Sequence, residues 1–246
     1  MCRWAAWLGQ PLFISEILSA PAHSLIHQSR EASKCKTAIN ADGFGLAWYG
    51  DHAQPGLYRD VYPAWSDPNL RSIAQQVRSR LFLAHVRAST CTATSRNNCH
   101  PFVQDRWAFM HNGQIGGFEA YRRQAEALIT DDLYPHRKGA TDSEVLFLLA
   151  CRLGIESDPQ TAMAQAVGLL EAIWQRRVGQ APHMRCTAAF TDWHGALCGA
   201  LCLGRLRALA LLPLVRRLAG LGCAFRALRH RRGRLDRGAK GQLLPL

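Results

Sequence analysis

The sequence predicts a mixed α and β domain over residues 1–192, followed by a tail of different composition over residues 193–246. Within the first part, short apolar segments alternate with longer segments that carry helix-start signals. At residue 193 the composition changes abruptly, which is unusual inside one globular domain. We therefore expect one main domain and an anomalous tail.

Four short segments are predicted as β-strands. Each is apolar or aromatic and is bounded by Gly, Asn, Asp or Thr, a pattern typical of half-buried or fully buried strands. They cover residues 44–49, 81–86, 107–111 and 185–190.

Two helices are predicted from an aspartate followed by a proline. Asp67 and Asp158 are capping residues, and the proline after each of them suits the first helical position. The first helix is expected over residues 69–79 and the second over residues 159–177.

A third helix begins with the sequence TDSE at residues 141–144. Thr141 and Glu144 form a capping box, in which each side chain is expected to accept from the other residue's backbone N–H. The helix is expected to continue over residues 145–153 and to stop at Gly154.

The net charge of +12 belongs mostly to the tail. Residues 1–192 hold 19 Lys and Arg against 17 Asp and Glu, whereas residues 193–246 hold 11 against one. The tail also contains 15 Leu and 10 Arg, and it lacks Ile, Ser, Thr, Glu, Asn, Tyr and Met. The balanced charge and apolar content of the first part exclude a disordered or fibrous chain.

The chain shows no membrane or secretion signal. The best apolar run, residues 206–222, is shorter than the roughly 18 residues that span a bilayer, and three arginines interrupt it. The N-terminus has neither a long apolar stretch nor a cleavage pattern. The nine cysteines show no disulfide-like spacing, so we expect a cytoplasmic protein.

Cys2 is the first candidate nucleophile. Met1 is normally removed before a small residue, and Cys2 would then carry a free α-amino group beside its thiol. Such an amine has a reference pKa of about 7.7 to 8.0 and can accept the thiol proton, usually through a water. A cysteine at this position is also often incidental.

Four further residues have both a functional and a purely structural interpretation. Asn112 and Gly113 offer two donors for an oxyanion, but Asn-Gly is also the strongest short hairpin signal. Arg87 at a strand end can bind a carboxylate or be a surface charge. Asp142 can bind an ammonium group or simply favour the first turn of a helix. Together with Cys2 they describe a site for an α-amino acid that carries an acyl side chain.

Six segments of the chain, taken in order, form a recognisable set. They are MCRW at 1–4, NADGFG at 40–45, HVRAST at 85–90, NCHPF at 98–102, HNG at 111–113 and TDSE at 141–144. Together they resemble the class II glutamine amidotransferases, and more narrowly the stand-alone bacterial branch that includes the ergothioneine-pathway γ-glutamyl hydrolase. The resemblance extends from residue 2 to about residue 192.

The resemblance implies an α+β fold, the four-layer αββα sandwich of the N-terminal nucleophile hydrolases. It implies that Cys2 is the nucleophile, that Asn112 and Gly113 form the oxyanion hole, and that Arg87 and Asp142 bind the substrate α-carboxylate and α-ammonium groups. The implied reaction attacks a γ-glutamyl amide such as glutamine, releases ammonia or an amine, and hydrolyses a glutamyl thioester. It needs no metal or organic cofactor.

The implied function leaves alternatives open. A dedicated γ-glutamyl conjugate hydrolase of an ergothioneine-like pathway is the second candidate enzyme. Because the sequence shows no synthetase domain, transfer of ammonia would need a separate synthetase as partner. Zinc binding by His85, Cys99, His100 and His111 is disfavoured because no Cys-x-x-Cys pair is present, and a papain-like Cys99–His100 pair would point to opposite sides of an extended chain.

The tail has three interpretations. It could bind nucleic acid or a membrane surface, but its apolar and basic residues lack a steady 3.6 period and Pro213 interrupts any helix. The third interpretation is a shifted reading frame starting between about residues 192 and 199. Read one nucleotide later, residues 200–213 permit RYASDGFAPSLYYR and residues 223–243 permit VLSEPFDTDEAGWTEVPKGSF, which resemble the family's closing strands. We therefore expect no nucleic-acid or membrane partner and a domain that lacks its closing strands.

Overall fold

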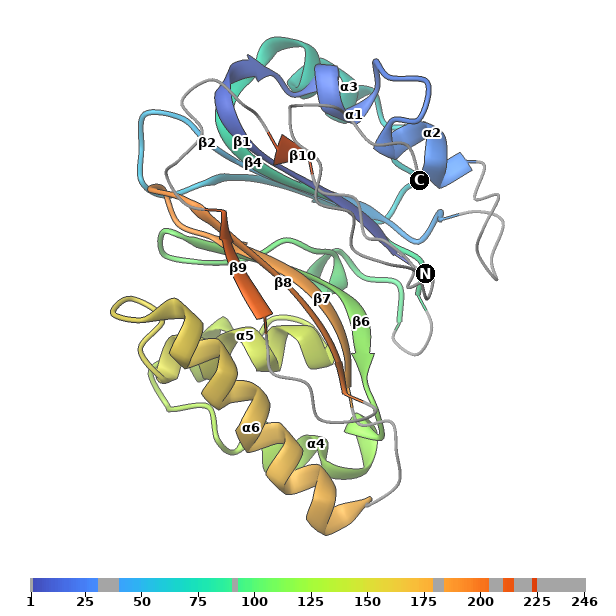
Figure 1. Cartoon of the computed structure of the whole chain (residues 1–246). Helices are drawn as coiled ribbons and strands as arrows, with labels where there is room; N and C mark the ends of the chain where they lie inside the picture. The colour runs from blue at the N-terminus through green and yellow to red at the C-terminus, as the bar shows by residue number, and fades with distance from the viewer. Residues whose placement is uncertain are drawn as a thin grey trace, which may run out of the picture.

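The structure is a computed structural model of the chain, and it describes residues 2–30, 40–89, 93–178, 184–203, 210–214 and 223–224. From residue 196 onward the description covers the backbone. Two antiparallel sheets are stacked face to face, with one group of helices on the outer side of each sheet (Figure 1). The predicted α+β sandwich of four layers is confirmed.

The N-terminal strand β1 lies inside the first sheet, between β10 and β4. The strand order of this sheet is β10-β1-β4-β2-β3, and every neighbouring pair is antiparallel. β1 pairs with β4 so that Arg3 lies opposite Val86, which brings Cys2 beside Arg87. The strands are β1 (Arg3–Phe13), β2 (Phe44–Tyr49), β3 (Gly56–Asp60), β4 (Arg78–Val86) and β10 (Cys223–Ala224).

The second sheet has the order β5-β6-β7-β8-β9, again with antiparallel neighbours. Asn112 and Gly113 lie inside β6, opposite Thr187 and Cys186 of β7. The hairpin-turn interpretation of Asn-Gly is therefore wrong, because the ladder with β7 continues to Ile115. The strands are β5 (Phe102–Gln104), β6 (Trp107–Ile115), β7 (Met184–Thr191), β8 (Ala196–Leu203) and β9 (Ala210–Leu214).

Three short strands come from the tail. β8 and β9 extend the second sheet beyond β7, and β10 pairs with β1 in the first sheet. The expectation that closing strands are missing thus differs from the structure, in which tail backbone forms the edge strands β9 and β10 and the strand β8 between β7 and β9. Residues 204–209, 215–222 and 225–246 lie outside the described residues, and the shifted reading frame stays a prediction.

The helices follow the predicted start signals. The Asp67 and Asp158 side chains cap α3 and α6, as predicted. α3 ends three residues earlier than predicted because Arg78 already pairs with Phe13 in the ladder between β4 and β1. The helices are α1 (Ser15–Leu18), α2 (Leu25–Arg30), α3 (Pro68–Gln76), α4 (Phe118–Glu126), α5 (Asp142–Arg152) and α6 (Pro159–Arg177), with 3-10 turns η1 (Arg96–Asn98) and η2 (Tyr134–His136).

The capping box of α5 forms only in part. Thr141 Oγ1 accepts from the Glu144 backbone N–H at 3.2 Å, as predicted. The Glu144 carboxylate turns away from Thr141 and accepts from the backbone N–H groups of Lys138 and Gly139, at 3.0 and 2.8 Å. It also pairs with Arg137, so a buried ion pair replaces the second half of the box.

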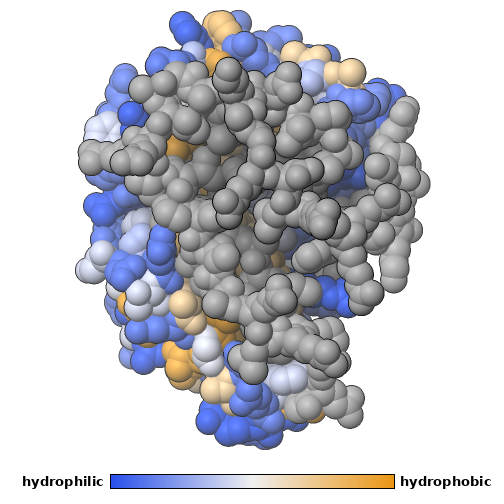
Figure 2. Space-filling model, viewed as in Figure 1, coloured by the Kyte–Doolittle hydropathy of each residue, from blue (hydrophilic) through white to orange (hydrophobic). Residues whose placement is uncertain are grey.

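Three apolar clusters hold the layers together. The cluster between the sheets uses small side chains, among them Ala6, Ala47, Ala108 and Ala189, which lets the two sheets approach closely. A second cluster joins the first sheet to α1–α3, and a third joins the other sheet to α4–α6. On the coloured part of the face in Figure 2, hydrophilic side chains predominate and hydrophobic ones lie in small patches. Within the described part of the chain, no helix combines the length and hydropathy needed to cross a bilayer.

Candidate active site

A cleft of about 410 Å³ lies where β1 begins, β4 ends and α4 and α5 start. Cys2, Arg87, Gly113 and Asp142 all line it. Asn112 contacts Cys2 directly, since its Nδ2 donates to the Cys2 carbonyl oxygen at 2.8 Å. The fold therefore brings together all five residues that the sequence singled out, from positions 140 residues apart in the chain.

The Cys2 thiol is held against the end of β4. Its Sγ accepts from the Ala88 backbone N–H at 3.3 Å and lies 3.5 Å from the Ala88 carbonyl oxygen. Burial raises the pKa of the Cys2 thiol, although the Ala88 hydrogen bond and the charges of the chain terminus and Arg87 act in the opposite direction. The thiol is thus protonated at neutral pH, and a nucleophilic role requires a nearby base.

Asn112 and Gly113 lie on β6 beside the thiol. One N–H of the Asn112 amide bonds the Cys2 carbonyl, and the amide has a second N–H. A Cβ added to Gly113 would lie 1.8 Å from the Arg185 carbonyl oxygen and 2.4 Å from His111 Nε2. Only glycine fits this position, because a side chain would force β6 away from β7.

Arg87 is buried and its guanidinium is held by the chain around it. Nη1 donates to the Asp42 carbonyl oxygen at 3.2 Å, and Nη2 donates to Ser89 Oγ at 3.1 Å and to the Ala93 carbonyl oxygen at 3.4 Å. These contacts fix the plane of the guanidinium at the wall of the cleft. A fixed guanidinium of this kind suits a carboxylate group.

Asp142 begins α5 directly after its cap, Thr141. Oδ2 accepts from the Ile115 backbone N–H at 2.7 Å, and Oδ1 accepts from the backbone N–H and the hydroxyl of Ser143 at 2.7 and 3.1 Å. A carboxylate has about four acceptor positions, so one remains for a donor in the cleft. The arrangement fits an ammonium ligand.

His111 and Ser143 also line the cleft, and the sequence interpretation had given neither of them a role beside Cys2. His111 Nδ1 lies 2.8 Å from Ser143 Oγ, although the two residues are 32 positions apart. One signal in the sequence bears on the position of His111: side chains alternate along β6, so the His111 side chain lies on the face opposite Asn112.

His85 and His100 form a buried pair next to the cleft. Their ring centroids are 4.5 Å apart, and within the part of the chain that the structure describes neither nitrogen of the His100 ring has a hydrogen-bond partner, whereas the His85 ring lies against the His111 backbone. Burial lowers the pKa of His85 to about 3 and that of His100 well below its ordinary value, so both rings are neutral at pH 7. Among the residues that the structure describes, no three His, Cys, Asp or Glu side chains are grouped so that they could hold a metal ion.

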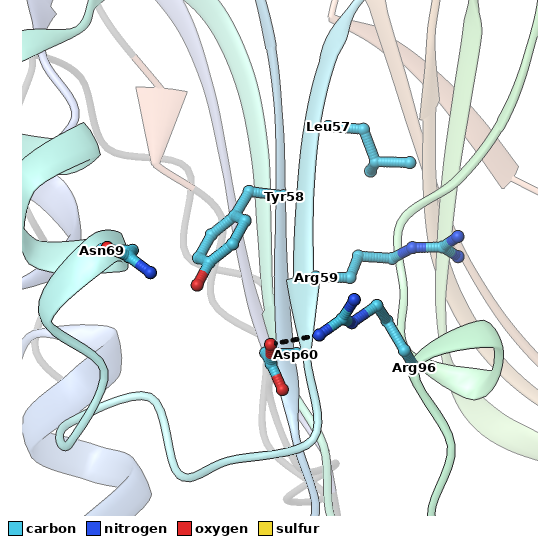
Figure 3. A pocket seen from close by; sticks show the side chains of 6 residues that line it. All are labelled: Leu57, Tyr58, Arg59, Asp60, Asn69 and Arg96. Carbon is cyan, nitrogen blue, oxygen red and sulfur yellow. Dashed lines mark hydrogen bonds and ion pairs between the residues drawn. The ribbon is translucent and has the colours of Figure 1, made fainter.

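A second cavity of about 380 Å³ lies at the free side of β3 (Figure 3). Arg96 Nη2 pairs with Asp60 Oδ2 across it at 2.7 Å, and the Arg59 guanidinium donates to the Cys99 carbonyl oxygen. None of its lining residues lines the cleft of Cys2, and it holds no nucleophile. Its lining residues are Leu57, Tyr58, Arg59, Asp60, Asn69 and Arg96.

Comparison with known proteins agrees with this geometry. Residues 17–176, more than half of the chain, match the family described as "Glutamine amidotransferases class-II". The chain belongs to this family. The predicted family resemblance is confirmed, whereas the roles of individual residues stay predictions.

Two curated relatives show the range of the class II glutamine amidotransferases that resemble this member. The chain is 39% identical over 158 residues to the probable glutamine amidotransferase DUG3 of Saccharomyces cerevisiae, covering 61% of this chain and 44% of that protein. It is 33% identical over 117 residues to the gamma-glutamyl-hercynylcysteine sulfoxide hydrolase of Mycolicibacterium smegmatis, covering 47% and 52%. The chain thus spans about half the length of the curated relatives it matches.

Solved structures of the family share the fold of this member. A glutamine aminotransferase class-II domain protein from Silicibacter pomeroyi is 47% identical, with a TM-score of 0.66 over 83% of this chain and 79% of that one. The glutamine phosphoribosylpyrophosphate amidotransferase of Bacillus subtilis is 14% identical, with a TM-score of 0.54 over 81% and 37%, and supports the fold alone.

Proposed function

We propose that this family member is an amidohydrolase in which the Cys2 thiol attacks a γ-glutamyl amide, with glutamine as the simplest substrate. One observation carries the proposal: the thiol, the Asn112–Gly113 pair, the Arg87 guanidinium and the Asp142 carboxylate meet in one cleft. A glutamyl group carries a carboxylate and an ammonium group at one end and the reacting carbonyl at the other. The cleft offers a matching group for each.

In the first half of the reaction, Cys2 Sγ forms a bond to the γ-carbonyl carbon and the thiol proton passes to the freed α-amine of Cys2. The negative charge on the carbonyl oxygen is stabilised by Asn112 Nδ2 and the Gly113 N–H. The carbon–nitrogen bond then breaks, and the amine returns its proton to the departing nitrogen, which leaves as ammonia or an amine.

In the second half, a water forms a bond to the thioester carbonyl carbon. One proton of the water passes to the α-amine and then to the departing sulfur as the carbon–sulfur bond breaks. The products of the two halves are glutamate, the amine and the free Cys2 thiol. The scheme requires that Met1 is removed, because a retained Met1 would convert the α-amine into an amide.

Hydrolysis of a larger γ-glutamyl conjugate is the second candidate. The similarity to the gamma-glutamyl-hercynylcysteine sulfoxide hydrolase favours it, and the cleft volume is within the range of small-molecule sites, about 300–1,000 Å³. An ammonia-accepting synthetase as partner belongs to the first candidate only, because a conjugate hydrolase releases its amine to water.

Glutamate release from purified protein tests the proposal and separates the candidates. The wild type is incubated with glutamine and with γ-glutamyl conjugates, and its intact mass shows whether Met1 is absent. Cys2→Ser is expected to abolish hydrolysis of every substrate, whereas Cys151→Ser, which changes a half-buried thiol of α5 outside the cleft, keeps it. Hydrolysis that survives in Cys2→Ser would overturn the proposal.

A further inference from the structure

His111 lies behind the residues proposed to bind the oxyanion. Along β6, Ala108 and Met110 face the other sheet, whereas Phe109 and Ile115 face the helical layer below. His111 shares the second face, so its ring points away from Cys2 and toward α5. The ring is buried beside Phe109, with centroids 6.5 Å apart and ring planes inclined by 30°.

The His111 ring connects a helix to a strand through two contacts. Nδ1 lies 2.8 Å from Ser143 Oγ of α5, and Nε2 lies 3.1 Å from the Arg185 carbonyl oxygen of β7. Ser143 Oγ in turn donates to Asp142 Oδ1 at 3.1 Å. A continuous chain of hydrogen bonds therefore runs from the Asp142 carboxylate to the backbone of β7.

The number of protons shared along these hydrogen bonds determines the protonation state of the His111 ring. The Ser143 hydroxyl has one proton, and when that proton is donated to Asp142 Oδ1 the hydroxyl can only accept a hydrogen bond from His111. The Arg185 carbonyl oxygen is an acceptor too. Both nitrogens of His111 then donate, and only the doubly protonated imidazolium has two donors.

We propose that His111 is a positioning residue: as a buried imidazolium bonded to Ser143 and to the Arg185 carbonyl, it fixes the Asn112–Gly113 donors relative to the Asp142 carboxylate. We call His111 with its contacts to Ser143 and to the Arg185 carbonyl the bridge. The inference rests on the proposed function, in which the Asn112–Gly113 pair at one end of the bridge binds the oxyanion and Asp142 at the other end binds the α-ammonium group. His111 itself touches neither reacting atom.

Close packing at Gly113 explains why the bridge controls position. The Arg185 carbonyl oxygen and His111 Nε2 both lie against the Gly113 α-carbon, where a methyl group would overlap them. Loss of the ring removes one of these two supports. Gly113 would then shift relative to Cys2, which weakens the oxyanion contact more than the binding of the substrate.

The groups around the ring support the cationic state. Burial lowers the pKa of His111, while Cys186, through its charge and a side-chain hydrogen bond, and then the Asp142 carboxylate and the Arg185 carbonyl raise it to about 9. The neutral His85 of β4, the neutral His100 between η1 and β5, and the Arg87 guanidinium just beyond β4 face the same region. Cys186 and Asp142 are thus the groups that offset the charge of a buried imidazolium.

Nuclear magnetic resonance of the uniformly nitrogen-15-labelled protein tests the protonation state without any assay. The His111 signals are assigned by their loss in His111→Gln. At pH 7 both ring nitrogens are expected to show the shifts of an imidazolium, and Ser143→Ala is expected to move the titration of the ring to lower pH. A neutral ring at pH 7 would overturn the proposal, whether or not the protein hydrolyses glutamine.

Kinetics test the positioning role. His111→Gln is expected to lower kcat by about tenfold to 100-fold with a smaller change in KM, a loss below that for removal of an oxyanion donor. His136→Gln is the control, an exposed histidine of η2 outside the cleft, and should keep the wild-type kcat. An unchanged kcat in a folded His111→Gln protein would refute positioning, whereas a wild type without hydrolysis would instead refute the proposed function.

Discussion

Asn112 Nδ2 donates a hydrogen bond to the carbonyl oxygen of Cys2, 2.8 Å away, and thereby joins the two sheets at the cleft. Asn112 belongs to β6 of one sheet, and Cys2 directly precedes β1 of the other. The proposed nucleophile and a proposed donor for the oxyanion are therefore held together by a contact between residues 110 positions apart.

The first prediction follows from this contact. Asn112→Ala removes a donor from the oxyanion and is expected to lower kcat by about 100-fold to 1,000-fold, with little change in KM. Asn97→Ala changes an exposed asparagine of η1 and should keep kcat. Steady-state glutamate release measures both, and equal kcat values for the two variants would contradict the role of Asn112.

The second prediction concerns Gly113. Gly113→Ala places a methyl group against the Arg185 carbonyl oxygen and His111, so we expect a loss of about 1–3 kcal/mol in the free energy of unfolding and a loss of activity. Gly168→Ala is the matched control in α6, where an added Cβ meets no atom within 4 Å. It should stabilise the helix by about 0.5–1 kcal/mol. Urea unfolding compares the two variants, and equal stabilities would contradict the packing argument.

The third prediction concerns acid stability. His85 has a folded pKa of about 3 against 6.5 unfolded, so between these values only the unfolded chain binds the proton. Stability should therefore fall as the pH drops from about 6.5 toward 3, by up to about 1.4 kcal/mol per pH unit for one such histidine. His111 acts in the opposite direction, since its contribution is complete below pH 6.5 and is lost as the pH rises through about 9.

Unfolding free energies between pH 4 and 8 measure this dependence. Because other groups of the wild type also titrate in this range, the wild type is compared with His85→Gln. Below pH 6.5 the free energy of unfolding of His85→Gln should fall less steeply with decreasing pH, whatever its value at pH 7. Parallel curves for the two proteins would show that His85 takes up its proton without unfolding.

The fourth prediction concerns the loop before α5. The Arg137 side chain is buried, and its guanidinium pairs with both Glu144 and Glu126. Arg137→Ala leaves the buried Glu144 carboxylate without its counter-charge and is expected to cost about 3–5 kcal/mol of stability. Arg122→Ala removes the more exposed partner of Glu126 and should cost less than about 1 kcal/mol. Thermal unfolding distinguishes them, and similar losses would contradict the argument.

Local sequence signals explain which elements could be predicted. α6 has the predicted bounds because Asp158 and Pro159 determine its start. β1 gave no clear strand pattern, since Gly9, Gln10 and Pro11 interrupt it where its register with β4 shifts. α4 lacked a start signal because its N-cap, Gly117, has no side chain to accept a hydrogen bond.

The residues of the candidate site, too, could be predicted only where a local sequence signal exists. Cys2 and Asp142 were found because each belongs to a recognisable short motif, whereas the bond between His111 and Ser143 joins a strand to a helix and leaves no pattern in either segment. The Asn-Gly pair was ambiguous for a physical reason: a turn and a straight strand both accept glycine, and only the pairing of β6 with β7 distinguishes them.

The last prediction concerns the tail, which we propose is read out of frame. β8, β9 and β10 pair with β7 and β1, so the positions of the closing strands fall in the segment whose composition is abnormal. A gene that encodes RYASDGFAPSLYYR from position 200 and VLSEPFDTDEAGWTEVPKGSF from position 223 should give a more soluble protein with a higher melting temperature, because it replaces a Leu- and Arg-rich segment at the sheet edges with segments in which polar and apolar residues are mixed and both signs of charge occur. The two proteins are compared by solubility, thermal unfolding and glutamate release. A chain with the present tail that is equally stable and active, or a sequencing result that confirms the frame over codons 190–200, would contradict the proposal.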